Sequence, residues 1–207
     1  MTKRGYHHGN VKQAMVNAAL ELIEEKGPLA FSITEAAKRI GVSAAAPYRH
    51  FVSKDDLIEE AARQGYEIFA DLMEFAYGDG RPTPLSSFEA TCRAYLAFAR
   101  KFPGHYIAMF ESGVSLNASP TLAQSAQRAK AVVELAASNL VSGMQVQDAP
   151  PPSMISDHIW AISHGVVELY ARGPEGVRSQ FSPEELLESG IGIYLRGLGA
   201  VKTGNRT

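Results

Sequence analysis

Apolar residues of this chain recur with the period of an α-helix over most of its length. Between residues 11 and 26 they return every three or four positions, and Gly27-Pro28 ends the run. No segment alternates with a strand period for long enough to compete. The chain is therefore predicted to be all-α, with about nine helices. The predicted helices cover residues 11–26, 33–40, 44–51, 54–77, 85–102, 104–112, 120–143, 153–172 and 182–201.

Residues 31–54 have the pattern of two short helices joined by a tight turn. Ser32 or Thr34 can cap the first helix, and Gly41 ends it, because glycine accepts the left-handed conformation of a tight exit. Ser43 is a suitable N-cap for the second helix. A connection of about three residues is typical of the helix-turn-helix, whose second helix enters the DNA major groove.

Three consecutive polar side chains lie in the second of these helices. Tyr48, Arg49 and His50 supply a phenol, a guanidinium and an imidazole, which fan toward phosphates and base edges. Lys54, at the start of the next predicted helix, is placed to meet a further phosphate. Such a triplet alone is more often a solvated helix surface, so the flanking pattern decides the interpretation in favour of DNA.

The segment from His8 to Leu57 resembles the DNA-binding domain of the TetR family of bacterial transcription regulators. The matching motifs are HHGN, EEKG, IGVS, PYRHF and SKDDL. The resemblance implies phosphate contacts by Tyr48, His50 and Lys54. It also implies groove-facing side chains at Thr34, Ala44, Ala45 and Arg49. Many relatives carry polar groups where this chain has Ala44–Ala46, so base readout is expected to rest on Arg49, Thr34 and apolar contact with thymine methyl groups.

The distribution of charge supports DNA binding by the N-terminal part. The net charge is −2 overall, but residues 1–54 hold eight Lys/Arg and four Glu, a net of +4, while residues 55–207 hold twelve Lys/Arg and eighteen Asp/Glu, a net of −6. A basic arm over residues 3–8 can follow a DNA backbone or enter a minor groove. We therefore expect a DNA-binding domain over residues 1–54 and a ligand-binding and dimerisation domain over residues 55–207.

A signature in the C-terminal part points to a subclass of the same family. Trp160, His164 and Gly165 resemble the W-x-x-x-H-G motif that names one subclass of TetR C-terminal domains. His164 is more simply explained as a packed core histidine than as a ligand or metal contact. Glu168, one helical turn further on, is a candidate partner for it or an interface acid.

The last predicted helix contains two pairs of glycines seven residues apart, Gly190 with Gly197 and Gly192 with Gly199. Glycine costs about 1 kcal/mol relative to alanine inside a helix, so close approach of another helix must offset the loss. The TetR resemblance implies a four-helix dimer interface, to which we assign these glycines and Tyr194; an intramolecular contact is the alternative. A dimer also presents two recognition helices to half-sites roughly 34 Å apart.

Aromatic and soft side chains are frequent in the predicted helices over residues 85–102 and 104–112. Such sets line mainly apolar ligand cavities, but they are equally typical of an ordinary core. The candidate lining residues are Tyr95, Tyr106, Met109, Trp160 and His164. We expect a small, largely apolar inducer. It favours a conformation of the dimer in which the spacing of the two DNA-binding domains does not fit DNA.

Other classes of function find less support in the sequence. A helical enzyme using His105, His158 or His164 with Glu168 or Asp157 lacks motifs such as H-E-x-x-H, G-x-S-x-G or a phosphate loop. A metal-sensing regulator is a closer alternative, although one cysteine and dispersed histidines disfavour a dedicated site.

The single cysteine, Cys92, cannot form an intramolecular disulfide, and we expect neither a membrane span nor a secretion signal. These features predict a protein of the reducing cytoplasm. We expect a homodimeric repressor that binds a palindromic double-stranded DNA operator, with no catalytic residues, cofactor or metal ligands.

Overall fold

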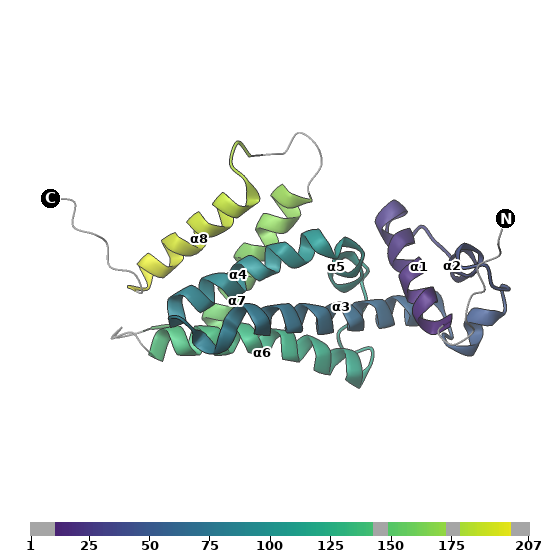
Figure 1. Cartoon of the computed structure of the whole chain (residues 1–207), viewed down its shortest axis with the longest axis horizontal. Coiled ribbons are helices and arrows are strands. Elements are labelled where there is room, and N and C mark those ends of the chain that lie inside the picture. The colour runs from purple at the N-terminus through teal and green to yellow at the C-terminus, as the bar shows by residue number, and fades with distance from the viewer. Residues whose placement is uncertain (1–10, 143–148, 173–178, 200–207) are drawn as a thin grey trace. The chain divides into compact units, whose positions relative to one another are not determined.

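The computed structural model describes residues 11–142, 149–172 and 179–199. Within these ranges the chain is all-helical, as the apolar periodicity predicted, with eight α-helices and no strand (Figure 1). In chain order the elements are α1 (Val11–Lys26), α2 (Ile33–Arg39), the 3-10 turn η2 (Ala46–Arg49), α3 (Lys54–Tyr77), the 3-10 turn η3 (Gly78–Gly80), α4 (Pro84–Lys101), α5 (Pro103–Phe110), α6 (Pro120–Ser142), α7 (Pro152–Val166), the π-helical turn η4 (Val167–Ala171) and α8 (Pro183–Gly197). The basic arm and the HHGN motif lie outside the described residues. None of the helices in the described ranges is long and apolar enough to cross a membrane.

The recognition segment is shorter than the predicted helix over residues 44–51. Its helical part is the single 3-10 turn η2, and its N-cap position is Ala45 rather than Ser43. Alanine has no side chain that can accept a backbone N–H, so the start of the segment lacks the capping hydrogen bond that would stabilise an α-helix there. This shortening accounts for eight described α-helices where about nine were expected.

The chain divides into two compact units. Unit 1 contains residues Met1–Tyr66 and Phe102–Ala126, and unit 2 contains Glu67–Lys101 and Gln127–Thr207. Because α3 and α6 each cross a boundary between these ranges, both helices contribute residues to both units.

Unit 1 is built around α1. This helix packs against α2, η2 and α5, so its inner face is enclosed by apolar neighbours. Five side chains on that face are completely buried: Met15, Val16, Ala19, Leu22 and Ile23. Burial of these residues holds the recognition segment on a rigid frame.

The core of unit 2 lies where α4 packs against α7 and α8. Phe88 and Phe98 of α4 are completely buried there, as is Phe69 of α3. A capping box starts α8: the Ser182 hydroxyl accepts the Glu185 N–H at 3.2 Å, and Glu185 Oε2 accepts the Ser182 N–H at 2.7 Å.

Candidate nucleic-acid interface

Surface ion pairs fix α2 against α1. Arg39 donates through both terminal nitrogens to the two oxygens of Glu25, at 2.7 and 2.6 Å. The hydrogen bond from Arg39 lowers the pKa of Glu25. Lys26 pairs in the same way with Glu35, and Ser32, one of the two predicted caps, accepts the Glu35 N–H at 3.2 Å. The helix-turn-helix therefore begins with a capped helix that packs on α1 through its buried face and is flanked by surface ion pairs.

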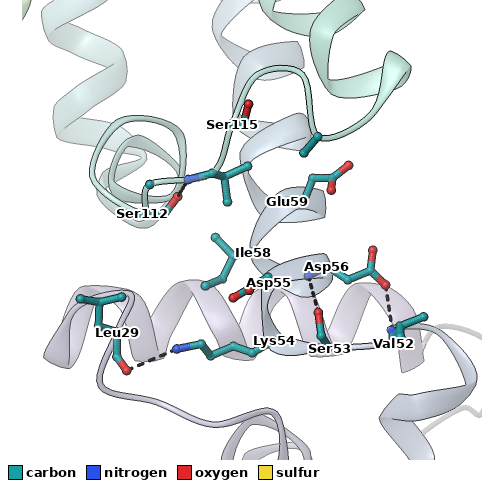
Figure 2. A pocket seen from close by; sticks show the side chains of 13 residues that line it. Leu29, Val52, Ser53, Lys54, Asp55, Asp56, Ile58, Glu59, Ser112 and Ser115 are labelled. Atoms are coloured by element: carbon teal, nitrogen blue, oxygen red, sulfur yellow. Dashed lines mark hydrogen bonds between the residues drawn. The ribbon is translucent and has the colours of Figure 1, made fainter.

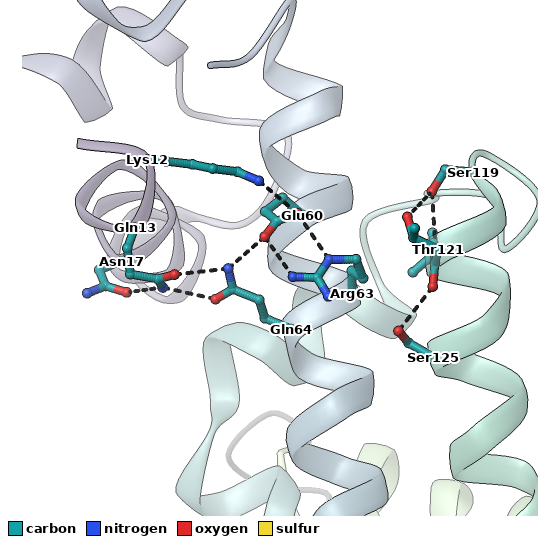
Figure 3. A network of polar contacts seen from close by, with 10 residues as sticks. Lys12, Gln13, Asn17, Glu60, Arg63, Gln64, Ser119, Thr121 and Ser125 are labelled. Carbon is teal, nitrogen blue, oxygen red and sulfur yellow. Dashed lines mark hydrogen bonds and ion pairs between the residues drawn. The ribbon is translucent and has the colours of Figure 1, made fainter. Parts of the chain in front are cut away.

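A polar network holds α1 against the first turns of α3 (Figure 3). The side-chain amides of Gln13 and Gln64 exchange hydrogen bonds at 2.9 and 3.1 Å. Glu60 accepts from Gln64 and Arg63 at 2.9 Å each, and its carboxylate lies 3.5 Å from Lys12 Nζ. Burial alone would raise the pKa of Glu60, but the hydrogen bonds from Arg63 and Gln64 outweigh it and lower the pKa to about 2. These contacts therefore anchor both ends of the segment that joins α1 to α3 and contains α2 and η2.

Most of the described cations of unit 1 are engaged in ion pairs within the chain, so few remain to contact DNA phosphates. The cations held in ion pairs are Lys12, Lys26, Arg39 and Arg63. Lys54 Nζ donates to the carbonyl oxygens of Pro28 and Leu29, at 3.3 Å each. In the described part of unit 1, Lys38 and Arg49 are the cations that have neither an ion pair nor a hydrogen bond from their charged groups. Sequence reasoning missed Lys38, because its availability depends on how the neighbouring cations are paired.

Three of the predicted DNA contacts, Tyr48, Arg49 and His50, lie on one exposed turn. Tyr48 is 55% exposed, and Arg49 and His50 beside it are also exposed, whereas Pro47 is buried beneath them. Ala44 and Ala45 are exposed immediately before η2. Thr34 is exposed at the start of α2, the helix that packs against η2, and its Oγ1 is 3.0 Å from Ser32 Oγ.

Three of the five candidate ligand-binding residues meet in unit 2. The Tyr95 hydroxyl is 2.9 Å from His164 Nδ1, and the Tyr95 and Trp160 rings meet edge to face at 5.6 Å. Both rings also contact Phe69, at 5.1 and 5.7 Å between centroids. The pairing of His164 with Glu168 suggested by their spacing is not present, and Glu168 Oε1 is buried without a hydrogen bond. Helical spacing placed the two side chains on one face, but Tyr95 from α4 approaches His164 more closely.

The aromatic cluster is closed. The cavity that Tyr95 and Trp160 line in unit 2 has a volume of about 10 Å³, enough for one water molecule at most. The other two candidates belong to unit 1, where Tyr106 is fully buried against Phe110 and Met109 lies against the Gly65 backbone.

The histidines considered for acid-base chemistry do not all belong to one unit. His105 is in unit 1, where burial lowers its pKa to about 4 and leaves its Nε2 without a hydrogen bond. In unit 2, His158 Nδ1 is 3.0 Å from the Tyr194 hydroxyl, and His164 bonds to Tyr95. In the described ranges, no group of three or more His, Cys, Asp or Glu side chains is placed to hold a metal ion.

The glycines of α8 have different surroundings within the chain. A Cβ at Gly190 would lie 3.5 Å from Ile162 Cγ2 of α7, so this glycine faces an intramolecular neighbour. A Cβ at Gly192 would be nearest to the Arg196 side chain of the same helix, and one at Gly197 would meet no described atom within 4 Å. Gly199 follows α8 with a φ of 75°.

Two family models match the chain. The model described as bacterial regulatory proteins of the tetR family matches residues 15–61, which include α2 and η2. The model described as the tetracyclin repressor-like C-terminal domain matches residues 88–194. A comparison with curated proteins found no match.

Solved structures share the fold. A protein with unknown function from Rhodococcus sp. RHA1 is 21% identical, with a TM-score of 0.80 over 95% of this chain and 99% of that chain. The TetR family regulator PfmR from Thermus thermophilus is 18% identical, with a TM-score of 0.70 over 89% and 98%. AibR, in a complex with isovaleryl coenzyme A and operator DNA, is 17% identical, with a TM-score of 0.68 over 88% and 96%.

The share of the chain that the two family models match establishes the family. The C-terminal model alone spans more than half of the chain, and the N-terminal model covers the helix-turn-helix. The chain therefore belongs to the TetR family of DNA-binding transcription regulators and is not an enzyme.

Proposed function

We propose that the protein is a homodimeric repressor that binds a palindromic operator and is released from it by a small, largely apolar inducer. The observation that carries the proposal is the exposed Tyr48-Arg49-His50 turn, which stands on buried Pro47 within the matched DNA-binding segment. In this proposal residues 1–54 read DNA and residues 55–207 bind ligand and dimerise. Binding to genomic DNA places the protein in the cytoplasm.

The described side chains suggest how the operator is held. Tyr48 and His50 donate to phosphates, and Lys38 and Arg49 supply the available positive charge. Lys54 has three donors and gives two of them to carbonyl groups, so one remains for a phosphate. Base readout rests on Arg49 and on the exposed side chains of Thr34, Ala44 and Ala45, the alanines facing thymine methyl groups.

Removing an available cation is expected to weaken operator binding in a salt-dependent way. Arg49→Gln should lower affinity for the operator by about 10- to 100-fold, and Lys38→Gln should reduce the slope of log affinity against log salt by about one. Fluorescence anisotropy with DNA flanking the gene, at several salt concentrations, measures both quantities. Arg81→Gln removes the same charge from unit 2 and serves as the control. Equal binding by all variants would contradict the proposed contacts.

The inducer site is proposed at Tyr95, Trp160 and His164 of unit 2; the other two candidates, Tyr106 and Met109, belong to unit 1 and are not assigned to it. The polar Tyr95–His164 pair among aromatic rings offers one oriented hydrogen bond in a mainly apolar setting. The W-x-x-x-H-G motif supplies two of these residues, and we assign the chain to that subclass. AibR, which shares the fold, was crystallised with an acyl coenzyme A and operator DNA. Because the cavity is closed, an inducer has to push these aromatic rings apart. The helix α3, which contributes residues to both units, transmits this change to the DNA-binding segment.

The dimer interface is proposed on α7 and α8. These helices pack together, and the His158–Tyr194 hydrogen bond ties them side by side. Large apolar side chains remain exposed on both, Met154 on α7 and Ile193 on α8. Gly197 is open to solvent in the single chain, which leaves room for another helix. We place Gly192, Tyr194, Gly197 and Gly199 in this interface, while Gly190 faces Ile162 of the same chain and is left to the intramolecular contact.

Placing a charge on the exposed face of α8 is expected to break the dimer. Ile193 is 62% exposed in the single chain, so Ile193→Glu should leave the fold intact while raising the dimer dissociation constant by about tenfold or more. Sedimentation equilibrium measures this constant. Leu135→Glu on α6 is a matched control, because Leu135 is 50% exposed but lies outside the proposed interface. A dimer that persists in Ile193→Glu would refute this interface.

A further inference from the structure

We infer that unit 1 carries a second small-molecule site, a groove that binds an amphipathic organic cation. The groove lies between residues 52–59 at the start of α3 and residues 112–118 after α5, with Leu29 at one end (Figure 2). Its volume is about 680 Å³, within the range of roughly 300–1,000 Å³ that is usual for ligand pockets. It is a different place from the aromatic cluster, which belongs to unit 2.

Apolar side chains form the floor and part of the rim of the groove. Ile58 is almost completely buried at its base. Leu29 and Val52 are 82% and 86% exposed, although both are aliphatic and both line the groove. A single exposed aliphatic residue is ordinary, but two at the edge of one groove above a third form a surface that an apolar group can cover.

The polar lining of the groove is negatively charged. Asp55, Asp56 and Glu59 all line it, and the one lining cation, Lys54, turns its ammonium group to the carbonyl oxygens of Pro28 and Leu29. Asp56 Oδ2 accepts the Val52 N–H at 2.9 Å. Among the described residues, no cation lies within ion-pair distance of Asp55 or Glu59. With three carboxylates and one ammonium group in its lining, the groove carries a net negative charge beside the apolar floor.

The apolar floor and the negative charge together indicate which class of ligand the groove binds. A phosphate would be repelled by the carboxylates, so Lys54 is the one lining residue that we assign to the DNA contact as well. The carboxylates do not form a metal-binding group, since no such group is found among the described residues. An organic cation with an apolar body matches this lining, because its body can cover the aliphatic side chains while its charge lies beside the carboxylates. Because residues 52–54 follow η2 after only two intervening residues, such a ligand would act on the DNA-binding unit itself.

Isothermal titration of the full chain with octyltrimethylammonium, below its micelle concentration, tests the site. We expect saturable binding that is about tenfold weaker in Asp55→Asn/Glu59→Gln, which keeps the side-chain shapes and removes two charges. Octanoate, with the opposite charge on a similar tail, is expected not to bind. Asp79→Asn/Glu134→Gln removes the same charge from unit 2 and should bind as wild type does.

Amide chemical shifts locate the bound probe. Shifts confined to residues 52–59 and 112–118 support the groove, whereas shifts confined to unit 2 overturn it. Equal affinity of the wild type and Asp55→Asn/Glu59→Gln also overturns the proposal. Binding that occurs only after Lys3→Gln/Arg4→Gln would assign the groove to the chain's own basic arm instead of a small cation. None of these readouts uses DNA, so they are independent of the operator experiment.

Discussion

Replacing Gly104 with alanine is expected to lower the free energy of unfolding by about 2 kcal/mol. A Cβ at this position would lie 2.9 Å from the Leu20 carbonyl oxygen and 2.7 Å from Glu24 Oε1. The carbonyl belongs to the backbone of α1, so the clash is relieved only if α1 and α5 move apart. The higher helix propensity of alanine offsets about 1 kcal/mol of a larger steric cost. Chemical denaturation of both proteins measures the difference.

Two further variants separate steric crowding from loss of the hydrogen bond. The Gly104 N–H donates to Glu24 Oε1 at 2.9 Å, and the amide oxygen of Glu24→Gln can still accept it. We therefore expect Glu24→Gln to be milder than Gly104→Ala. Gly65→Ala should also be milder, because its nearest neighbour is Met109 Sδ, at the end of a flexible side chain. If Gly104→Ala were as stable as the wild type, the close packing of α1 on α5 would be wrong.

Acidification is expected to destabilise the protein through His105. Burial lowers the pKa of this histidine from 6.5 to about 4, and its Nε2 has no hydrogen bond to stabilise a bound proton. The unfolded chain therefore binds a proton at higher pH than the folded chain does. The stabilisation that neutral His105 gives to the folded protein is fully present above pH 6.5 and is lost as the pH falls toward 4. Over this range the free energy of unfolding decreases by about 3 kcal/mol.

Unfolding free energies of the wild type and His105→Leu, measured from pH 7.5 to 4, isolate this effect. The variant keeps an apolar side chain of similar reach beside Phe102, but it cannot titrate. Carboxylates such as Glu60 titrate in both proteins, so their contribution cancels in the difference. The wild type should lose up to about 3 kcal/mol more than the variant. Parallel pH profiles would show that His105 is solvated rather than buried.

Much of the DNA-binding segment was predictable because its signals are local. Ser32 caps α2 and Gly41 follows it with a φ of 74°, as their residue types indicated. The order and approximate bounds of the helices likewise follow from apolar spacing along the chain. The predicted length of the recognition helix was wrong: only the 3-10 turn Ala46–Arg49 forms, and its N-cap residue, Ala45, offers no capping side chain.

The ligand-binding candidates show why a candidate site is harder to predict than a helix. Tyr95 and His164 are 69 positions apart, so their hydrogen bond could not be read from helical spacing, which favoured Glu168 instead. Tyr106 and Met109 share the aromatic and soft character of that cluster, yet they belong to unit 1. Composition identifies residues suited to a pocket, but packing decides which of them meet.

The sequence by itself determined the all-helical class, the cap of α2 and the glycine turn that follows it, because these depend on neighbours within a few positions. The exposure of Tyr48, Arg49 and His50 depends on how η2 packs against α1 and α2. Tertiary structure alone decided which charges remain available. Lys54 reaches the carbonyl groups of Pro28 and Leu29 more than twenty residues away, and it is the one cation that lines a groove with three carboxylates. Such contacts depend on side chains brought together by folding, and periodicity along the chain carries no information about them.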